Sequence, residues 1–265
     1  MRIALLIQYD GTAYYGWQIQ VDPKTVQGSI ERALSKLFDR SIRIVGSGRT
    51  DSGVHALGQV AHFDIDQTSI PPLKIWRALN QQLPADIRVV ASAEVDGDFH
   101  SRFLPVYREY RYQISNRINV LNRNKHWLIH FPLDQHKLAR SAELILGEHD
   151  FSSFCFAGTE TENMICCIES ATWTVDNDRE LTFTIRGNRF LHHMVRMLVG
   201  SRVEVARGKW EIQRMIDLLN IPDRKAHTVT APAQGLTLIN VSYPNESQPS
   251  WIDDEESLAS LKTTG

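Results

Sequence analysis

Hydrophobic and polar positions follow two different periods in the first hundred residues. An apolar run that alternates into Gln8 and Asp10 predicts a strand over residues 2–9. Thr25 is well placed to cap a helix whose apolar residues recur at helical spacing. Those residues are Val26, Ile30, Ala33, Leu34 and Leu37. The remaining elements of this half are two strands, a helix that follows Pro71 and Pro72, and a last strand, predicted over residues 42–44, 59–65, 73–79 and 86–95.

A similar succession is predicted in the second half. Period-two alternation over residues 107–115 places Tyr110, Tyr112 and Ile114 on one face of a strand. A helix over residues 134–146 follows, and Gly147 is a residue type that ends helices. The later elements are a hairpin around Asn177 and Asp178, two helices and a last strand, predicted over residues 169–175, 180–186, from about 190, 211–219 and 236–241.

Each half therefore has the order β-α-β-β-α-β, which gives an antiparallel sheet covered by helices. The fold class predicted is α+β, with two ferredoxin-like halves whose sheets join around a central RNA-binding cleft. We place the N-terminal subdomain at residues 1–105, the C-terminal subdomain at 106–244 and an acidic, disordered tail at 245–265.

Composition narrows the class of protein only slightly. The chain of 265 residues has no stretch approaching the roughly 18 apolar residues of a membrane span. Its N-terminus lacks a small-residue cleavage site and is interpreted as a strand rather than a signal peptide. The formal net charge is −2, but five of the acidic residues follow Pro244 with a single lysine, so the preceding residues carry a net charge of +2. Any RNA site must therefore be a local basic patch.

Three cysteines, Cys155, Cys166 and Cys167, form no C-x-x-C pair. This odd number argues against a disulfide framework or a structural zinc site. We interpret them as buried, unreactive thiols in a reducing compartment.

The segment with the most unusual composition runs from Gly46 to Gly53 and reads GSGRTDSG. Its glycines allow a tight loop between two strands, in which Arg49 and Asp51 are the charged residues. Such a loop can present a catalytic carboxylate. The alternative is an ordinary polar turn in which Asp51 accepts hydrogen bonds from local backbone amides.

A second candidate is the apolar segment after Gly187, predicted to be a helix. On a helix, Arg189, His192 or His193, Arg196 and Gly200 share one stripe. An arginine on a core-like helix needs a partner, and Asp51 is a candidate. The alternative is an amphipathic helix with a solvated basic edge. The two adjacent histidines would point in different directions, which disfavours a joint metal site.

Aromatic residues are interleaved with charged ones in two further segments. Residues 107–112 read YREYRY, a composition suited to stacking unpaired bases and contacting phosphates, although ordinary strand residues have it too. Residues 9–18 read YDGTAYYGWQ and predict either an RNA-facing surface or a packed loop.

Taken together and in order, these segments resemble the bacterial TruA family of tRNA pseudouridine synthases. The resemblance extends to about Pro244 and rests on YDGTAYYGWQ, VQGSIERAL, GRTDSGVHALGQVAHF, DFHSRF, REYRY, GEHDFSSF, NRFLHHMVRMLVG and the Gly-Leu pair that ends at Leu236. The acidic tail lies outside it.

The resemblance implies a cytoplasmic homodimer that isomerises uridines 38, 39 and 40 in the anticodon arm of tRNA without a cofactor or metal. By the same resemblance Asp51 is the catalytic nucleophile, Arg196 pairs with it, and Arg49 lies in the same loop. Tyr110 lies against the target base. The other substrate-binding residues expected are His193, Arg189 and Leu236.

Two other functions remain open from the residues alone. A non-catalytic RNA-binding protein, such as a tRNA chaperone, would keep the aromatic and basic residues but would not need Asp51. A metal-dependent hydrolase would use His55, His62 and aspartates, but the chain lacks the H-x-x-x-H or paired acidic spacing that such sites have.

Overall fold

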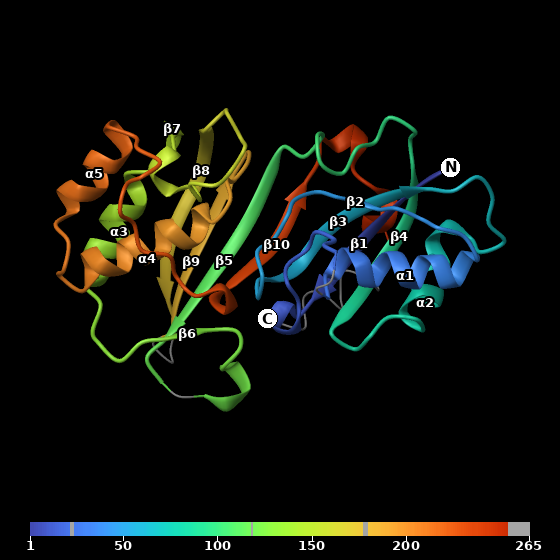
Figure 1. The fold of residues 1–265 in the computed structure, drawn as a ribbon, viewed down its shortest axis with the longest axis horizontal. Helices are drawn as coiled ribbons and strands as arrows, with labels where there is room; N and C mark the ends of the chain where they lie inside the picture. The colour runs from blue at the N-terminus through green and yellow to red at the C-terminus, as the bar shows by residue number, and fades with distance from the viewer. Residues whose placement is uncertain (22–23, 118, 177–179, 254–265) are drawn as a thin grey trace. The chain divides into compact units, whose positions relative to one another are not determined.

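The computed structural model describes residues 1–21, 24–117, 119–176 and 180–253, and the chain forms two compact units (Figure 1). The first unit contains Met1–Val106 and the chain from Leu238 onward, and the second contains Tyr107–Thr237. Among the described residues, no helix has the length and apolar character needed to span a membrane.

The first unit is built on an antiparallel sheet. Its strands lie in the order β4-β1-β3-β10, and β2 pairs with β3. In this sheet Leu6 lies opposite Val60 on one side and Ala91 on the other. Two helices belong to this unit and are seen beside its strands in Figure 1. The elements are β1 (Arg2–Tyr9), α1 (Val26–Phe38), β2 (Val45–Gly46), β3 (His55–Asp64), α2 (Ile75–Asn80), β4 (Ile87–Val95) and β10 (Leu236–Ser242).

The local sequence explains where α1 begins and ends. The Thr25 side chain accepts a hydrogen bond from the Gly28 amide, so it caps the helix as predicted. Val26, Ile30 and Leu34 are buried at helical spacing, which fixes the face turned to the core. The helix ends at Asp39, which takes the left-handed conformation with a φ of 50°.

The second unit is built on further strands that pair mostly antiparallel. Its strands lie in the order β5-β9-β8-β7, and β6 pairs in parallel with β5. Helix α3 packs against β8 and α4, and α5 contacts both other helices. The elements are β5 (Tyr107–Ser115), β6 (Trp127–Leu128), α3 (Gln135–Glu143), β7 (Gly147–Asp150), β8 (Ile165–Val175), β9 (Leu181–Gly187), α4 (Met194–Ala206) and α5 (Ile212–Asn220).

The α+β class is confirmed, and several details differ from the prediction. The helix expected over residues 134–146 ends at Glu143, and strands β6 and β7 were not predicted. The strand expected over residues 42–44 is irregular backbone in which Ile42 and Ile44 are buried. The strand in this region is the two-residue β2, which follows it. The helix expected from about 190 begins at Met194. Residues from Leu238 belong to the first unit because β10 packs closely on β3, where a Cβ on Gly58 would lie 2.2 Å from the Ile239 carbonyl oxygen.

Two other predictions fall partly on residues that the structure does not describe. Strands β8 and β9 pair as a hairpin, but Asn177 and Asp178 of its expected turn lie outside the described residues. So do residues 254–265 of the predicted tail. The part of that segment that is described forms two short 3₁₀ turns, Asn245–Ser247 and Ser250–Asp253, and the Trp251 side chain is buried.

Candidate active site

The residues predicted to carry function lie in both units. The first unit holds Arg49 and Asp51, and the second holds Tyr110, Arg189, His193, Arg196 and Leu236. The two groups are built from different elements, and each is held in place by hydrogen bonds within its own unit.

Asp51 lies in a loop that connects β2 to β3 and is fastened at both ends. After β2, the Ser47 amide donates to the Val60 carbonyl at 2.7 Å and its hydroxyl to Gln59 Oε1 at 2.6 Å. Before β3, the Val54 amide donates to the Asp51 carbonyl at 3.2 Å, which closes a turn around Ser52 and Gly53. The Asp51 side chain is half-buried at the head of this turn. The loop therefore holds the carboxylate in a defined place while leaving part of it accessible.

The N-terminal glycine-rich segment supports the same loop. The Trp17 amide donates to the Thr50 carbonyl at 3.1 Å, and the Gly53 amide to the Tyr14 carbonyl at 3.2 Å. Gly16 has a φ of +83°, and a Cβ there would lie 2.6 Å from the Thr50 oxygen, so only glycine allows this approach. Sequence reasoning left open whether this segment faces RNA or packs; most of it packs.

Two buried aromatic residues anchor that segment. Tyr9 donates to or accepts from Thr50 through its hydroxyl at 2.8 Å, and Tyr14 donates to Asp86 at 2.5 Å. Burial, followed by the Asp86 hydrogen bond, raises the pKa of Tyr14, so its phenol stays protonated. Tyr15 differs from them, because 61% of its surface is exposed.

Arg196 lies in the first turn of α4 and is fixed to a neighbouring extended segment. Its Nε donates to the Ala231 carbonyl at 2.9 Å, and the Ala231 amide donates to the Arg196 carbonyl at 3.1 Å. Gly200 permits this contact, because a Cβ there would lie 2.1 Å from the Val229 oxygen. The guanidinium orientation is thus set by contacts within its own unit.

The helical stripe predicted for Arg189, His192 or His193, Arg196 and Gly200 is wrong. Only Arg196 and Gly200 lie on α4. His193 caps the helix with a φ of 65°, a left-handed conformation that interrupts the helical path, so residues 188–192 form an irregular segment. The two histidines also do not diverge as predicted, since their ring centroids lie 4.2 Å apart.

Two phenylalanines beside these residues were missed. The Phe190 ring meets the Tyr110 ring edge-on at 5.2 Å. The Phe156 ring lies 5.0 Å from that of His192 and 5.4 Å from that of His193. Phe156 lies in the aromatic-rich segment DFSSFCF and Phe190 in NRFLHH, and neither follows a strand or helix period.

The YREYRY segment forms β5 and contributes mainly to structure. Tyr112 is buried and donates to the Pro232 carbonyl at 2.8 Å, next to the residue that holds Arg196. Arg108 donates to the Asn188 carbonyl at 2.7 Å and braces the segment that contains Arg189. Leu236 begins β10 and is buried. Most of these aromatic residues are therefore ordinary strand residues. Tyr110 differs from them because its ring meets that of Phe190, next to Arg189 in the chain.

The histidines of the alternative hydrolase are committed to backbone amides. His55 is buried, and its Nδ1 accepts from the Gly11 amide at 3.0 Å. His62 is buried too, and its Nδ1 accepts from the Ser101 amide at 3.2 Å. Burial, and then the nearby Arg2 and His100, lowers the pKa of His62 to about 4. These contacts make both residues structural, which disfavours the hydrolase.

Two of the three cysteines match the expectation of unreactive thiols. Cys155 and Cys166 are buried, whereas Cys167 is partly exposed, and all three are free. Burial raises the pKa of the Cys166 thiol to about 12 and also raises that of Cys155, so neither is a ready nucleophile.

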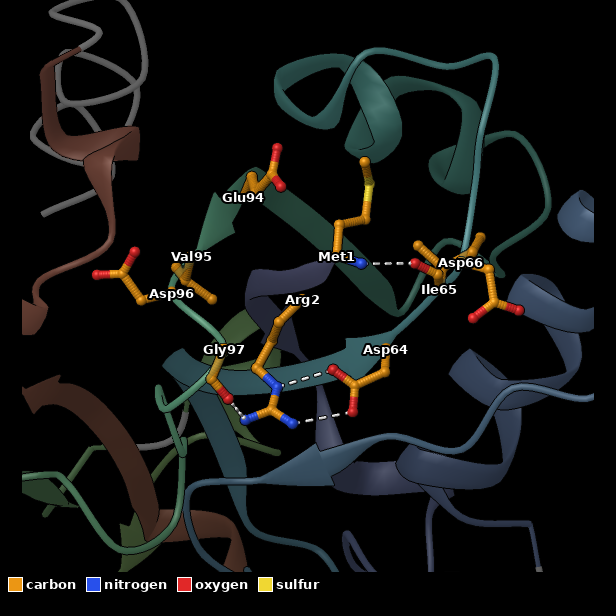
Figure 2. Close-up of a pocket in the computed structure, with 9 residues that line it drawn as sticks. All are labelled: Met1, Arg2, Asp64, Ile65, Asp66, Glu94, Val95, Asp96 and Gly97. Atoms are coloured by element: carbon orange, nitrogen blue, oxygen red, sulfur yellow. Dashed lines mark hydrogen bonds and ion pairs between the residues drawn. The ribbon is translucent and has the colours of Figure 1, made fainter.

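A pocket of about 390 Å³ lies at the other end of β3 from the Asp51 loop (Figure 2). In it Arg2 forms a two-pronged ion pair with Asp64, at 2.8 and 2.9 Å, and donates to the Gly97 carbonyl. The hydrogen bond from Arg2 lowers the pKa of Asp64. Because β3 extends about 3.3 Å per residue over ten residues, this acidic pocket is not part of the candidate site.

Comparison with known proteins gives consistent matches over most of the chain. A family model described as tRNA pseudouridine synthase matches residues 5–104 and 141–244. The protein called tRNA pseudouridine synthase A in Halalkalibacterium halodurans is 45% identical over 89% of this chain and 90% of its own length. Its namesake in Bacillus pumilus is 43% identical over 92% of this chain and 100% of its own length.

One solved structure with a weaker similarity was also found. A chain from a crystal structure of a Cbf5-Nop10-Gar1 complex aligns with 89% of this chain and 57% of its own length, at 10% identity and a TM-score of 0.38. That score is too low to carry an argument about the site.

Proposed function

This chain belongs to the tRNA pseudouridine synthase family, and we propose that it isomerises uridines 38, 39 and 40 in the anticodon arm of tRNA with Asp51 as the catalytic carboxylate. The family makes it an isomerase that acts on tRNA. The uridine positions, the residue roles, a cytoplasmic location and a homodimer that binds the anticodon arm are the proposed part.

The observation that carries the role of Asp51 is the construction of its loop. Hydrogen bonds donated by the amides of Ser47, Gly53 and Val54, and one accepted by the Thr50 carbonyl, fix the backbone on either side of Asp51. A polar turn that only reversed the chain would not need Gly16 of a distant segment to pack against the Thr50 backbone. Preorganised placement of this kind is what a catalytic group needs.

The proposed chemistry suits a carboxylate. The bond between uracil N1 and ribose C1′ breaks, the base turns, and a bond forms from C1′ to C5. The hydrogen on C5 leaves as a proton, and N1 gains one. Cleavage places positive character on the sugar, which ionised Asp51 stabilises or attacks. The reaction involves no net oxidation or reduction, so its balance calls for no redox cofactor.

The remaining residues have supporting roles in this proposal. Arg196 pairs with Asp51 and favours its ionised form, while Arg49 helps from the same loop. Tyr110 lies against the uracil ring and limits its rotation, backed by Phe190 at 5.2 Å. His193, Arg189 and Leu236 contact the tRNA. The target must leave its stack, which costs a few kcal/mol and is offset by stacking and phosphate contacts.

Tritium release from tRNA that carries 5-tritiated uridine tests the role of Asp51. We expect the wild type to release tritium with or without EDTA, and Asp51→Asn to lose turnover while still binding tRNA. Asp39→Asn is the matched control, because it makes the same chemical change at an exposed residue of the same unit. Substantial release by Asp51→Asn would reject the assigned role. Tight tRNA binding by a wild type that releases no tritium would favour the RNA-binding alternative.

The pairing of Asp51 with Arg196 has its own test. We expect Arg196→Met to lose activity mainly because Asp51 is misplaced. The double variant Asp51→Asn/Arg196→Met should then be no worse than Asp51→Asn alone. Near-normal turnover in Arg196→Met would show that the pair does not act in catalysis.

A further inference from the structure

The Phe156 side chain is the most unusual exposed group beside the candidate residues of the second unit. Its neighbours along the chain, Phe154 and Cys155, are buried, yet 45% of the Phe156 surface is exposed. An aromatic ring loses favourable transfer free energy when it stays in water. Folding of the unit alone therefore does not account for its position.

The ring is nevertheless held in place from several sides. The Phe156 amide donates to the His192 carbonyl at 3.0 Å, and the Thr159 amide donates to the Phe156 carbonyl at 3.0 Å. A Cβ on Gly158 would lie 2.6 Å from Cε1 of the ring, so glycine allows the loop to fold directly against it. On another side it meets the imidazoles of His192 and His193. The exposed ring is thus preorganised.

The histidine side of this cluster leads directly into α4. His193 is the N-cap of that helix and has a left-handed backbone conformation, and Arg196 follows in the first turn. Non-glycine residues in that conformation are strained and concentrate at functional sites. The cluster of Phe156, His192 and His193 is therefore continuous in the chain with a proposed catalytic residue.

The charges around the cluster favour a flat, neutral ligand over a phosphate. Arg189 and Arg224 lie near enough to lower the pKa of the Cys155 thiol, although burial has the larger, opposite effect. The same loop carries the exposed carboxylates Glu160 and Glu162. Mixed charge of this kind gives no strong attraction for a phosphate, but it leaves an aromatic face available for stacking.

We propose that Phe156, supported by His192 and His193, forms a stacking platform for an unpaired base next to the target uridine. This inference rests on the proposed function and adds a substrate-binding residue to it. Single-stranded RNA is recognised largely through bases that stack on aromatic side chains. Stacking does not require protonation or metal binding by the histidines, whose rings pack against the phenylalanine.

Steady-state kinetics and tRNA binding of Phe156 variants test the platform. We expect Phe156→Leu to raise KM and the Kd for tRNA about 5- to 30-fold with kcat within about twofold, which corresponds to roughly 1–2 kcal/mol of stacking. Phe156→Trp should retain nearly wild-type values because it keeps the aromatic face. Gly158→Ala should give an intermediate loss because it displaces the ring. Ile221→Ala, which removes another exposed apolar side chain of this unit, is the control.

The salt dependence of binding separates stacking from phosphate contact. Loss of a phosphate contact lowers the slope of log K against log salt concentration, whereas loss of stacking leaves it unchanged. We expect Phe156→Leu to keep the wild-type slope. Wild-type affinity in Phe156→Leu, or a loss that Phe156→Trp shares equally, would overturn the proposal.

The outcomes also distinguish this inference from the proposed function. If the wild type forms pseudouridine and Phe156→Leu binds and reacts normally, only the platform is rejected. If the wild type forms none, the proposed function fails, and the ratio of tRNA affinities between Phe156→Leu and Phe156→Trp still decides the platform.

Discussion

Replacing Arg202 with methionine should make the protein more stable. Arg202 lies on α4 and is fully buried. Its Nε donates to the Ser141 carbonyl at 3.3 Å, in the last turn of α3, and its guanidinium lies 5.1 Å from the Phe183 ring centre. Neither terminal nitrogen has a hydrogen-bond partner among the described residues. Burial lowers the pKa of Arg202 to about 9, which shows how unfavourable the charge is in this position.

The expected gain follows from these contacts. An unsatisfied buried polar group costs about 1–3 kcal/mol, and Arg202 has two such nitrogens. Removing the guanidinium also loses one long hydrogen bond, worth about 1 kcal/mol, and a cation–π contact worth about 1–2 kcal/mol. Methionine fills most of the same volume with an unbranched apolar chain. The balance is a gain of about 1–2 kcal/mol, in line with the replacement of other buried charges by apolar residues.

Urea unfolding at pH 7 measures this gain, with thermal unfolding as a second readout. We expect Arg202→Met to raise the free energy of unfolding by that amount and the Tm by about 2–8 °C. Arg202→Ala is the control and should be destabilising, because it leaves a cavity where methionine does not. A loss of more than about 1 kcal/mol in Arg202→Met would refute the reasoning and mean that the guanidinium is well solvated or paired in solution.

The remaining predictions concern a buried base and a close helix contact. His62 has a folded pKa of about 4 against 6.5 for the free side chain, so the unfolded chain binds its proton first as the pH falls. The contribution of His62 to the free energy of unfolding should therefore be fully present above pH 6.5, and up to about 3 kcal/mol of it should be lost between pH 6.5 and 4. Urea unfolding across this pH range should show a smaller loss in His62→Gln. Gly200→Ala should destabilise the protein by about 2 kcal/mol or more, because the added Cβ would meet the Val229 oxygen, and it should lower activity by moving Arg196. Gly97→Ala is the control, because a Cβ there meets nothing within 4 Å. A Tm and turnover of Gly200→Ala equal to those of Gly97→Ala would contradict this prediction.

Periodic segments were predictable from the sequence to within a few residues. The strands at residues 2–9 and 107–115 match β1 and β5, because alternating residues along them face either the core or the other side of the sheet. Thr25 marks the start of α1 through its own side chain, whereas the helix expected to end at Gly147 ends at Glu143 and Gly147 begins β7. These features depend on local sequence, so a single chain contains enough information to find them.

Features set by distant contacts were not predictable in the same way. The apolar run from Phe190 onward has a helical composition, but the left-handed His193 delays the helix to Met194. The close approach of Gly16 to Thr50 depends on two segments that are more than thirty residues apart. Of the candidate site, the Asp51 loop was recognisable by its composition, whereas the grouping of Phe156 with His192 arises only from the folded path of the chain.

The division of β10 between the two units has a consequence for biosynthesis. A ribosome completes residues 1–106 and must then add the roughly 130 residues of the second unit before it reaches Leu238. At about 5–20 residues per second, this leaves the edge of β3 without β10 for roughly 6–26 s. During that interval the nascent first unit presents an open sheet edge, which is a typical binding site for chaperones and a risk for aggregation between neighbouring nascent chains. The first unit, whose N-terminal part is synthesised first, can therefore complete its sheet only after β10 has been synthesised.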